Sequence, residues 1–133
     1  MAAAYEIPVL QYSLVAGADL SAKQFYGVTI DSNGQAVVAG VGTVIAGVLQ
    51  NKPVSGGEAA IMALGITKMS AGGALATPGV NVGVDSTGRV KAITLGAGSG
   101  TSMIGILLTA AGAAGDLVSV LLLPAGALPT TPA

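Results

Sequence analysis

One short pattern occurs twice in this chain. VTIDSNGQAVVA occupies residues 28–39, and VGVDSTGRVKAI occupies residues 82–93. In each copy, alternating apolar residues lead into Asp-Ser-x-Gly and a second alternating run follows, which is typical of a β-hairpin. Asn33-Gly34 suits a tight turn that needs positive φ, whereas Thr87-Gly88 suits the same geometry less well. The pattern therefore predicts two hairpins, the first more strongly than the second.

The similarity continues downstream of both hairpins. AGVLQNKPVSGGE at 46–58 aligns without a gap on IGILLTAAGAAGD at 104–116, with Gly47 on Gly105. We interpret this as two copies of one unit, consisting of a hairpin, a loop, a strand, a glycine-containing turn and a strand. The copies span about 27–66 and 81–123. Chance similarity between segments rich in Gly and Val is the alternative.

The repeat resolves an ambiguity about secondary structure. EAAIMALG at 58–65 has helical propensity, but its counterpart DLVSVLLL at 116–123 reads as a strand that ends before Pro124. We therefore expect strands in both places. Nine strands are expected in all, near 8–15, 24–31, 35–40, 43–50, 58–68, 80–85, 89–95, 102–109 and 117–123.

Short strands separated by glycine turns, without helical periodicity, predict an all-β fold. We expect a compact β-barrel or sandwich of about nine short strands, with an internal pseudo-repeat and extended terminal arms. Residues 1–15 would form an N-terminal arm, 16–123 a single β-domain and 124–133 a C-terminal tail. A helical turn is possible within 69–79, before the Thr77-Pro78-Gly79 bend.

Composition indicates a protein that lives in an assembly. Hydrophobic residues make up 52% of the chain and charged residues only 8%, so only eleven charged side chains are available to cover the surface. An uncharged apolar surface is a liability in solution unless a partner covers it. A monomer with a surface of Ser, Thr, Asn, Gln and Gly is the alternative. The net charge of −1, without a basic cluster, argues against a nucleic-acid partner.

A membrane partner is also not expected. The uncharged run from Ala92 to Gly115 is long enough to span a bilayer, but glycines interrupt it repeatedly. Each glycine costs about 1 kcal/mol in a helix interior. We therefore expect no transmembrane helix.

The chain offers little catalytic chemistry. It has no His and no Cys, so most nucleophilic, metal-binding and redox constellations are absent. Asp31-Ser-Asn-Gly resembles the start of a calcium loop, but its later ligand positions hold Ala39 and Gly42. We interpret Asp31 and Asp85 as turn stabilisers. The expectation is no enzyme, no cofactor, no metal and no small-molecule substrate.

The segment YEIPVLQYSL at 5–14 holds two of the four aromatic residues of the chain. It either completes the barrel of its own chain as a terminal strand, or reaches onto a neighbour as an arm through strand addition. Its aromatic and apolar residues lie outside the repeat. They are the candidate partner-binding residues, for a capsid or a neighbouring subunit: Tyr5, Ile7, Val9, Leu10 and Tyr12.

Two further segments carry a family resemblance. AGADLSAKQFYGVTID at 16–31 and IAGVLQNKPVSGGEAAI at 45–61 resemble the small capsid decoration, or cement, proteins of tailed bacteriophages. The matching positions are Gly17, Asp19, Leu20, Ser21, Gln24 and Phe25 in the first segment, and Gly47, Val48, Leu49, Gln50, Asn51, Pro53 and Gly56 in the second. The likeness covers roughly residues 16–123.

The resemblance implies a β-rich protein that binds the outside of an icosahedral head after the shell expands. It implies the major capsid protein as the partner, a homo-oligomer with a trimer favoured, and a location on the outer capsid surface of virions assembled in the host cytoplasm. Such a protein would cement the shell against internal DNA pressure. A self-assembling surface or sheath protein that needs no capsid is the alternative.

Overall fold

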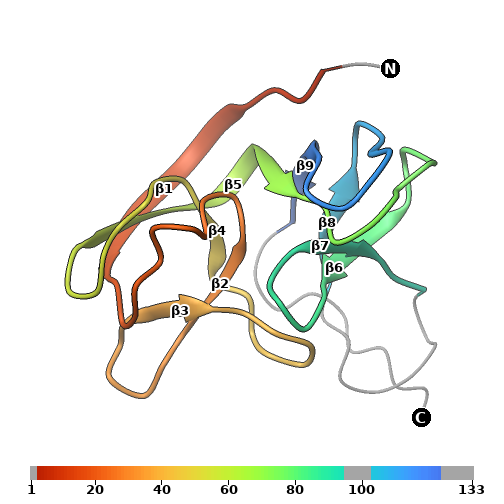
Figure 1. Ribbon diagram of the computed structural model, residues 1–133. Helices are drawn as coiled ribbons and strands as arrows, with labels where there is room; N and C mark the ends of the chain where they lie inside the picture. The colour runs from red at the N-terminus through yellow and green to blue at the C-terminus, as the bar shows by residue number, and fades with distance from the viewer. Residues whose placement is uncertain (1–2, 95–102, 124–133) are drawn as a thin grey trace, which may run out of the picture.

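A computed structural model describes residues 3–94 and 103–123 (Figure 1). These residues form nine β-strands and no helix, which confirms the all-β fold; a strand lies at each expected range, with β1 beginning one residue earlier and β5 ending two residues later than expected. The helical turn expected within 69–79 is absent. The strands are β1 (Ile7–Val15), β2 (Gly27–Ile30), β3 (Ala36–Val38), β4 (Gly47–Leu49), β5 (Glu58–Ser70), β6 (Asn81–Val84), β7 (Val90–Ala92), β8 (Met103–Leu107) and β9 (Leu117–Leu122).

All nine strands belong to one antiparallel sheet that curls into two lobes. The strand order is β3-β2-β4-β5-β9-β8-β6-β7, and β1 pairs separately with β5. Figure 1 shows β1 to β4 in one lobe and β6 to β9 in the other, with β5 running between them. Of the two alternatives for the N-terminal segment, the structure has the strand that pairs with its own chain. Residues 124–133, expected as a tail, lie outside the described part.

The two lobes have equivalent strand orders when each is read from its outer edge of the sheet toward the middle. It runs β3-β2-β4-β5 on one side and β7-β6-β8-β9 on the other. Strand β5 belongs to both lobes. Its first half pairs with β1, and its second half pairs with β9 in the equivalent way. We therefore describe a first repeat (residues 7–64) and a second repeat (residues 65–122), which share this one long strand.

Both hairpin turns have the same geometry. The Asp31 Oδ1 atom accepts hydrogen bonds from the backbone N–H groups of Asn33 and Gln35, each at 2.9 Å. The Asp85 Oδ1 atom accepts the equivalent bonds from Thr87 and Arg89. Only the glycine of each turn has positive φ, at 75° in the first and 86° in the second. Both predicted turns are therefore present, and the second is as well formed as the first because its Thr does not need positive φ.

The alignment of the repeats shifts by one residue at the next turn. The Gly56 N–H donates to the Ala16 carbonyl, and the Gly115 N–H donates to the Ala71 carbonyl in the same way. Gly56, with φ 83°, therefore corresponds to Gly115, with φ 90°. The gapless sequence alignment matched Gly57 with Gly115 instead, so it is wrong by one residue from this turn onward.

Each lobe has its own core. The first repeat buries one cluster of mainly aliphatic residues: Ala16, Leu20, Val28, Ala36, Leu49, Ala59 and Ile61. Equivalent residues occupy the second lobe in a larger cluster: Ala71, Leu75, Val82, Val90, Leu107, Val118 and Val120. The larger cluster also holds Val48 and Met62 of the first repeat. The two lobes are therefore joined by continuous apolar packing as well as by β5.

Candidate interaction surface

The structure exposes four of the five candidate partner-binding residues. Tyr5, Ile7, Val9 and Leu10 all rank among the exposed large hydrophobic side chains, and Val9 is 73% exposed. Val9 stands where the register of β1 against β5 is shifted, so the strand is irregular at this point. Large apolar side chains at an irregular sheet edge form a surface that another protein can cover.

Tyr12 differs from the other four residues. Its side chain is half-buried against the core of the first repeat, and its hydroxyl donates a 2.9 Å hydrogen bond to the Ala46 carbonyl. Burial raises the pKa of the Tyr12 hydroxyl above its ordinary value. The structure therefore gives Tyr12 contacts within its own chain and does not place it with the exposed group.

The residues before β1 are attached to the second repeat. The Ser119 hydroxyl accepts a hydrogen bond from the Tyr5 N–H at 2.6 Å and donates one to the Tyr5 carbonyl at 2.7 Å. A Glu6 carboxylate oxygen accepts weaker bonds of 3.3 Å from the Lys68 N–H and the Thr67 hydroxyl. This N-terminal segment therefore crosses the sheet from β5 to β9 and holds Tyr5 and Ile7 in place.

Cross-strand pairing assembles an apolar row that sequence analysis did not identify. Ile7 pairs with Ile66, Ile66 with Leu121, and Leu121 with Ile106. Directly opposed residues of antiparallel strands share one face of the sheet, so the four side chains form a row across β1, β5, β9 and β8. Ile7 and Leu121 are exposed, and the other two are half-buried. The sequence of β9 gave no alternating signal for this row, because only Leu117 and Leu121 of the strand are exposed, and the pairing partners could not be read from the sequence.

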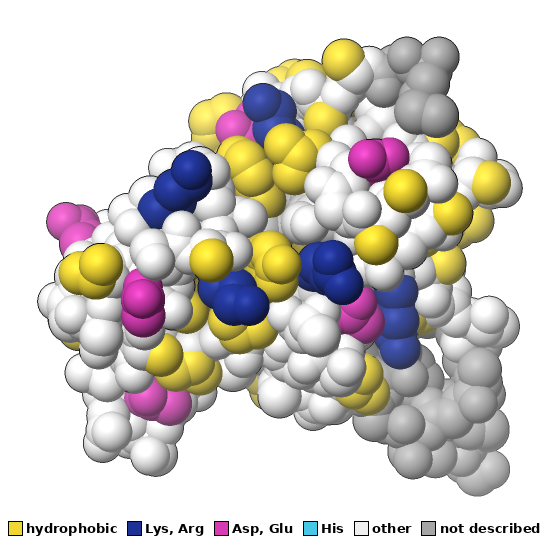
Figure 2. All heavy atoms as spheres, in the orientation of Figure 1, with side chains coloured by type: hydrophobic (Ala, Val, Ile, Leu, Met, Phe, Trp, Pro, Cys, Tyr) yellow, Lys and Arg dark blue, Asp and Glu magenta, His cyan; other side chains and the backbone are white. Residues whose placement is uncertain are grey.

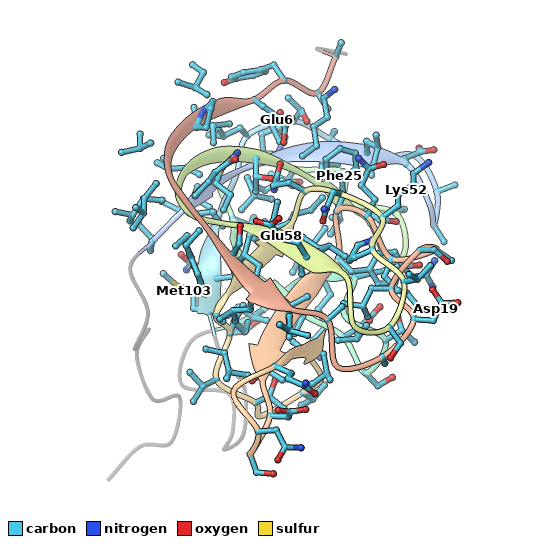
Figure 3. All side chains as sticks on the ribbon, turned by 90° about the vertical axis from the view of Figure 1, so that its left-hand side faces the viewer. Glu6, Asp19, Phe25, Lys52, Glu58 and Met103 are labelled. Atoms are coloured by element: carbon cyan, nitrogen blue, oxygen red, sulfur yellow. The ribbon has the colours of Figure 1, made fainter. Side chains whose placement is uncertain are left out.

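Charged side chains are distributed unevenly over the molecule. Figure 2 shows Lys, Arg, Asp and Glu side chains spread over both lobes on the face that it presents. In Figure 3 the side that carries Lys52 and Asp19 is tipped with nitrogen and oxygen, whereas the upper part of the side that carries Met103 consists mainly of carbon. Polar side-chain atoms are therefore more frequent on the side that carries Lys52 and Asp19 than on the upper part of the side that carries Met103.

An apolar groove of about 450 Å³ opens in the first repeat. Its lining has no charged side chain and consists of Tyr12, Thr29, Ile30, Val44, Ile45, Ala46 and Ala63. The residues equivalent to Ala46 and Ala63 in the second repeat are Ile104 and Leu122, both of which are buried. The groove therefore exists because alanines stand where the other repeat has larger aliphatic residues.

Several acidic side chains accept backbone hydrogen bonds within the described part of the chain. No three His, Cys, Asp or Glu side chains there lie close enough to hold a metal ion.

Burial alone would raise the pKa of Asp85, but hydrogen bonds from Thr87 and Arg89 and the charge of Arg89 outweigh it and hold the pKa below its ordinary value. A hydrogen bond from the Ser21 side chain likewise lowers the pKa of Asp19. No helix in residues 3–94 and 103–123 is long and apolar enough to cross a membrane.

Comparison with known proteins gives a match in structure only. No protein-family model matches the chain, and no curated protein matches its sequence. Among solved structures, the chain is similar to the head fiber gp8.5 N base of bacteriophage phi29, with a TM-score of 0.64 and 15% sequence identity. The match covers 86% of this chain and 93% of that one. The two proteins therefore share their fold over almost their whole length.

Proposed function

We propose that this chain is a structural protein of a bacteriophage virion and binds the outer surface of the icosahedral head. The observation that carries the proposal is the fold shared with a phage head fiber base over most of both chains. The apolar surface around β1 supports it, because a protein with this surface is expected to work in contact with another. We further propose a non-catalytic role, which the absence of His and Cys supports.

The finer proposal is that binding cements the expanded shell. The chain would bind only the expanded form of the major capsid protein, so binding would oppose the reversal of expansion by mass action. Many copies of a modest contact suffice when all of them hold one shell together. Tyr5, Ile7, Val9 and Leu10 would make this contact, because they are exposed, apolar and fixed by the pairing of β1 and by the Ser119 bonds.

The test compares heads of the encoding phage with and without the purified chain. We expect the chain to raise the temperature at which heads release DNA, measured with a DNA-binding dye. Val9→Asp should abolish this rise, because the new charge would be desolvated in the contact. Val54→Asp is the matched control, since Val54 is also well exposed and lies outside β1. An unchanged effect of Val9→Asp would exclude this part of β1 as the contact.

A second candidate role follows from the structural neighbour, which is the base of a head fiber. A base protein would attach to the head and carry a further part, without needing to stabilise the shell. Binding of the chain to heads whose DNA-release temperature does not change would favour this role over cementing.

A further inference from the structure

The two repeats contact each other within the chain through a hairpin tip. The Gly27 N–H of the first repeat donates a 2.8 Å hydrogen bond to the Gly88 carbonyl at the tip of the β6–β7 hairpin. A Cβ atom on Gly27 would collide with the Val84 side chain of the same hairpin. The second hairpin therefore packs closely on β2 of the first repeat.

The surface that receives this hairpin is a row of paired residues. Gln11 pairs with Met62, Met62 with Val48, and Val48 with Gly27. Met62 and Val48 are buried in one apolar cluster with Val84. Met62 and Val48 of this row are thus covered by the second repeat, whereas Gln11 at its end is exposed.

The second repeat carries the equivalent row, but the described chain does not cover it. Ile66 pairs with Leu121, Leu121 with Ile106, and Ile106 with Asn81. Leu121 is 37% exposed, whereas its equivalent in the first row, Met62, is 1% exposed. A comparable apolar surface is therefore available in the second repeat, with one difference: Asn81 stands where the first row has Gly27, so a hairpin cannot approach the strand as closely at that end of the row.

The first repeat carries the equivalent hairpin, whose tip is open. Ile30 corresponds to Val84, yet Ile30 is 48% exposed and Val84 is 4% exposed. Gly34 corresponds to Gly88, and a Cβ atom on Gly34 would meet nothing, whereas one on Gly88 would meet backbone and side chain of the first repeat. Residues 3–94 and 103–123 therefore include a hairpin tip and an apolar row that they leave exposed, and these correspond to the two halves of the contact between the repeats.

We propose that a second copy of this chain completes the contact. The β2–β3 hairpin of one copy, with Ile30 and Gly34, packs on the row formed by Ile66, Leu121, Ile106 and Asn81 of the next copy. The two halves are different surfaces, so the contact is head-to-tail, and repetition of it gives a closed ring or an open chain. We commit to a second copy because the new interface repeats the intrachain contact over Leu121 and Ile106, the counterparts of Met62 and Val48, while the hairpin lies farther from the strand at Asn81 than the intrachain hairpin does at Gly27.

The proposal is tested by absolute mass in solution from light scattering. We expect the unmodified chain to form oligomers, and Ile30→Asp and Leu121→Asp to remain monomers, because each variant loses one half of the contact. Asn81→Arg is a second change to the row, useful if Leu121→Asp does not fold, because the longer, charged Arg side chain would have to be desolvated under the hairpin. Val54→Asp is the control and should form oligomers, since Val54 belongs to neither surface. Circular dichroism verifies that each variant is folded.

Mixing the variants tests the head-to-tail geometry. Ile30→Asp has an intact row and Leu121→Asp has an intact hairpin, so an equimolar mixture should give a species of twice the monomer mass and nothing larger. A monomeric wild-type chain at high concentration, or oligomers of the folded Ile30→Asp variant, would overturn the proposal. Head binding is measured separately, so a chain that forms oligomers but ignores heads would overturn the proposed function alone.

Discussion

At the scale of single residues, the two hairpin turns are determined by neighbouring residues in the sequence. Asp at the start and Gly at the end fix each hairpin turn, and both residues were identified in the sequence. The residue between them matters less, because it keeps an ordinary negative φ. Tyr12 could not be separated from the other four candidates at this scale, since whether an aromatic side chain on a strand points inward depends on pairing with a distant strand.

Asp85 is expected to make stability depend on pH. The pKa of Asp85 lies below its ordinary value of 3.8 in the folded chain. Its carboxylate therefore stabilises the fold above that ordinary pKa, and the stabilisation is lost as the pH falls through the folded pKa. We expect Asp85→Asn to be less stable than wild type at pH 7, with the difference narrowing on acidification. Urea unfolding from about pH 6 down to about pH 2 measures this, and a constant difference would contradict it.

Ser119 is expected to hold the N-terminal segment. Ser119→Ala removes both hydrogen bonds to Tyr5 at a cost of about 1 kcal/mol in the free energy of unfolding. Hydrogen exchange at the Tyr5 amide should become much faster, while exchange in β5 stays slow. Ser13→Ala, at an exposed position of β1, is the control and should change neither. Continued protection of the Tyr5 amide in Ser119→Ala would show that other contacts hold the segment.

At the scale of elements, the sequence predicts where the strands lie, but it does not predict that β5 belongs to both repeats. All nine strands follow from alternation and glycine turns, because those signals are local. The double role of β5 was not predicted, since it needs the upstream match of Ala16-Gly17 with Ala71-Gly72, which is too short to notice in so simple a composition. The one-residue slip at Gly56 has the same cause, because neighbouring glycines align equally well by sequence.

The aligned glycines of β4 and β8 are expected to be required for strand packing. A Cβ atom on Gly47 would collide with the Met62 carbonyl oxygen, and one on Gly105 with the Leu121 carbonyl oxygen. Because backbone must move to make room, Gly47→Ala and Gly105→Ala should each lower the free energy of unfolding by about 1–3 kcal/mol or more. Gly73→Ala, where a Cβ atom would meet nothing, should be close to neutral. Thermal unfolding of the three variants tests this, and equal stability would refute it.

At the scale of the whole molecule, the sequence predicted part of the surface. The exposed residues of β1 were found because they are consecutive and rich in apolar side chains. The row of Ile66, Leu121 and Ile106 was not found, because three strands distant in sequence contribute one residue each. Low charge predicted a partner, but only the arrangement of the repeats showed which apolar residues the chain covers itself and which it leaves exposed.

Saturable binding to expanded heads tests the central claim most directly. Increasing amounts of the purified chain are mixed with expanded heads of the phage proposed to carry it, the heads are pelleted, and the bound chain is quantified. We expect binding to saturate at a fixed number of copies per head, with little binding to unexpanded heads. A folded chain that stays in the supernatant at every concentration would contradict the account of this protein as a structural component of the phage head.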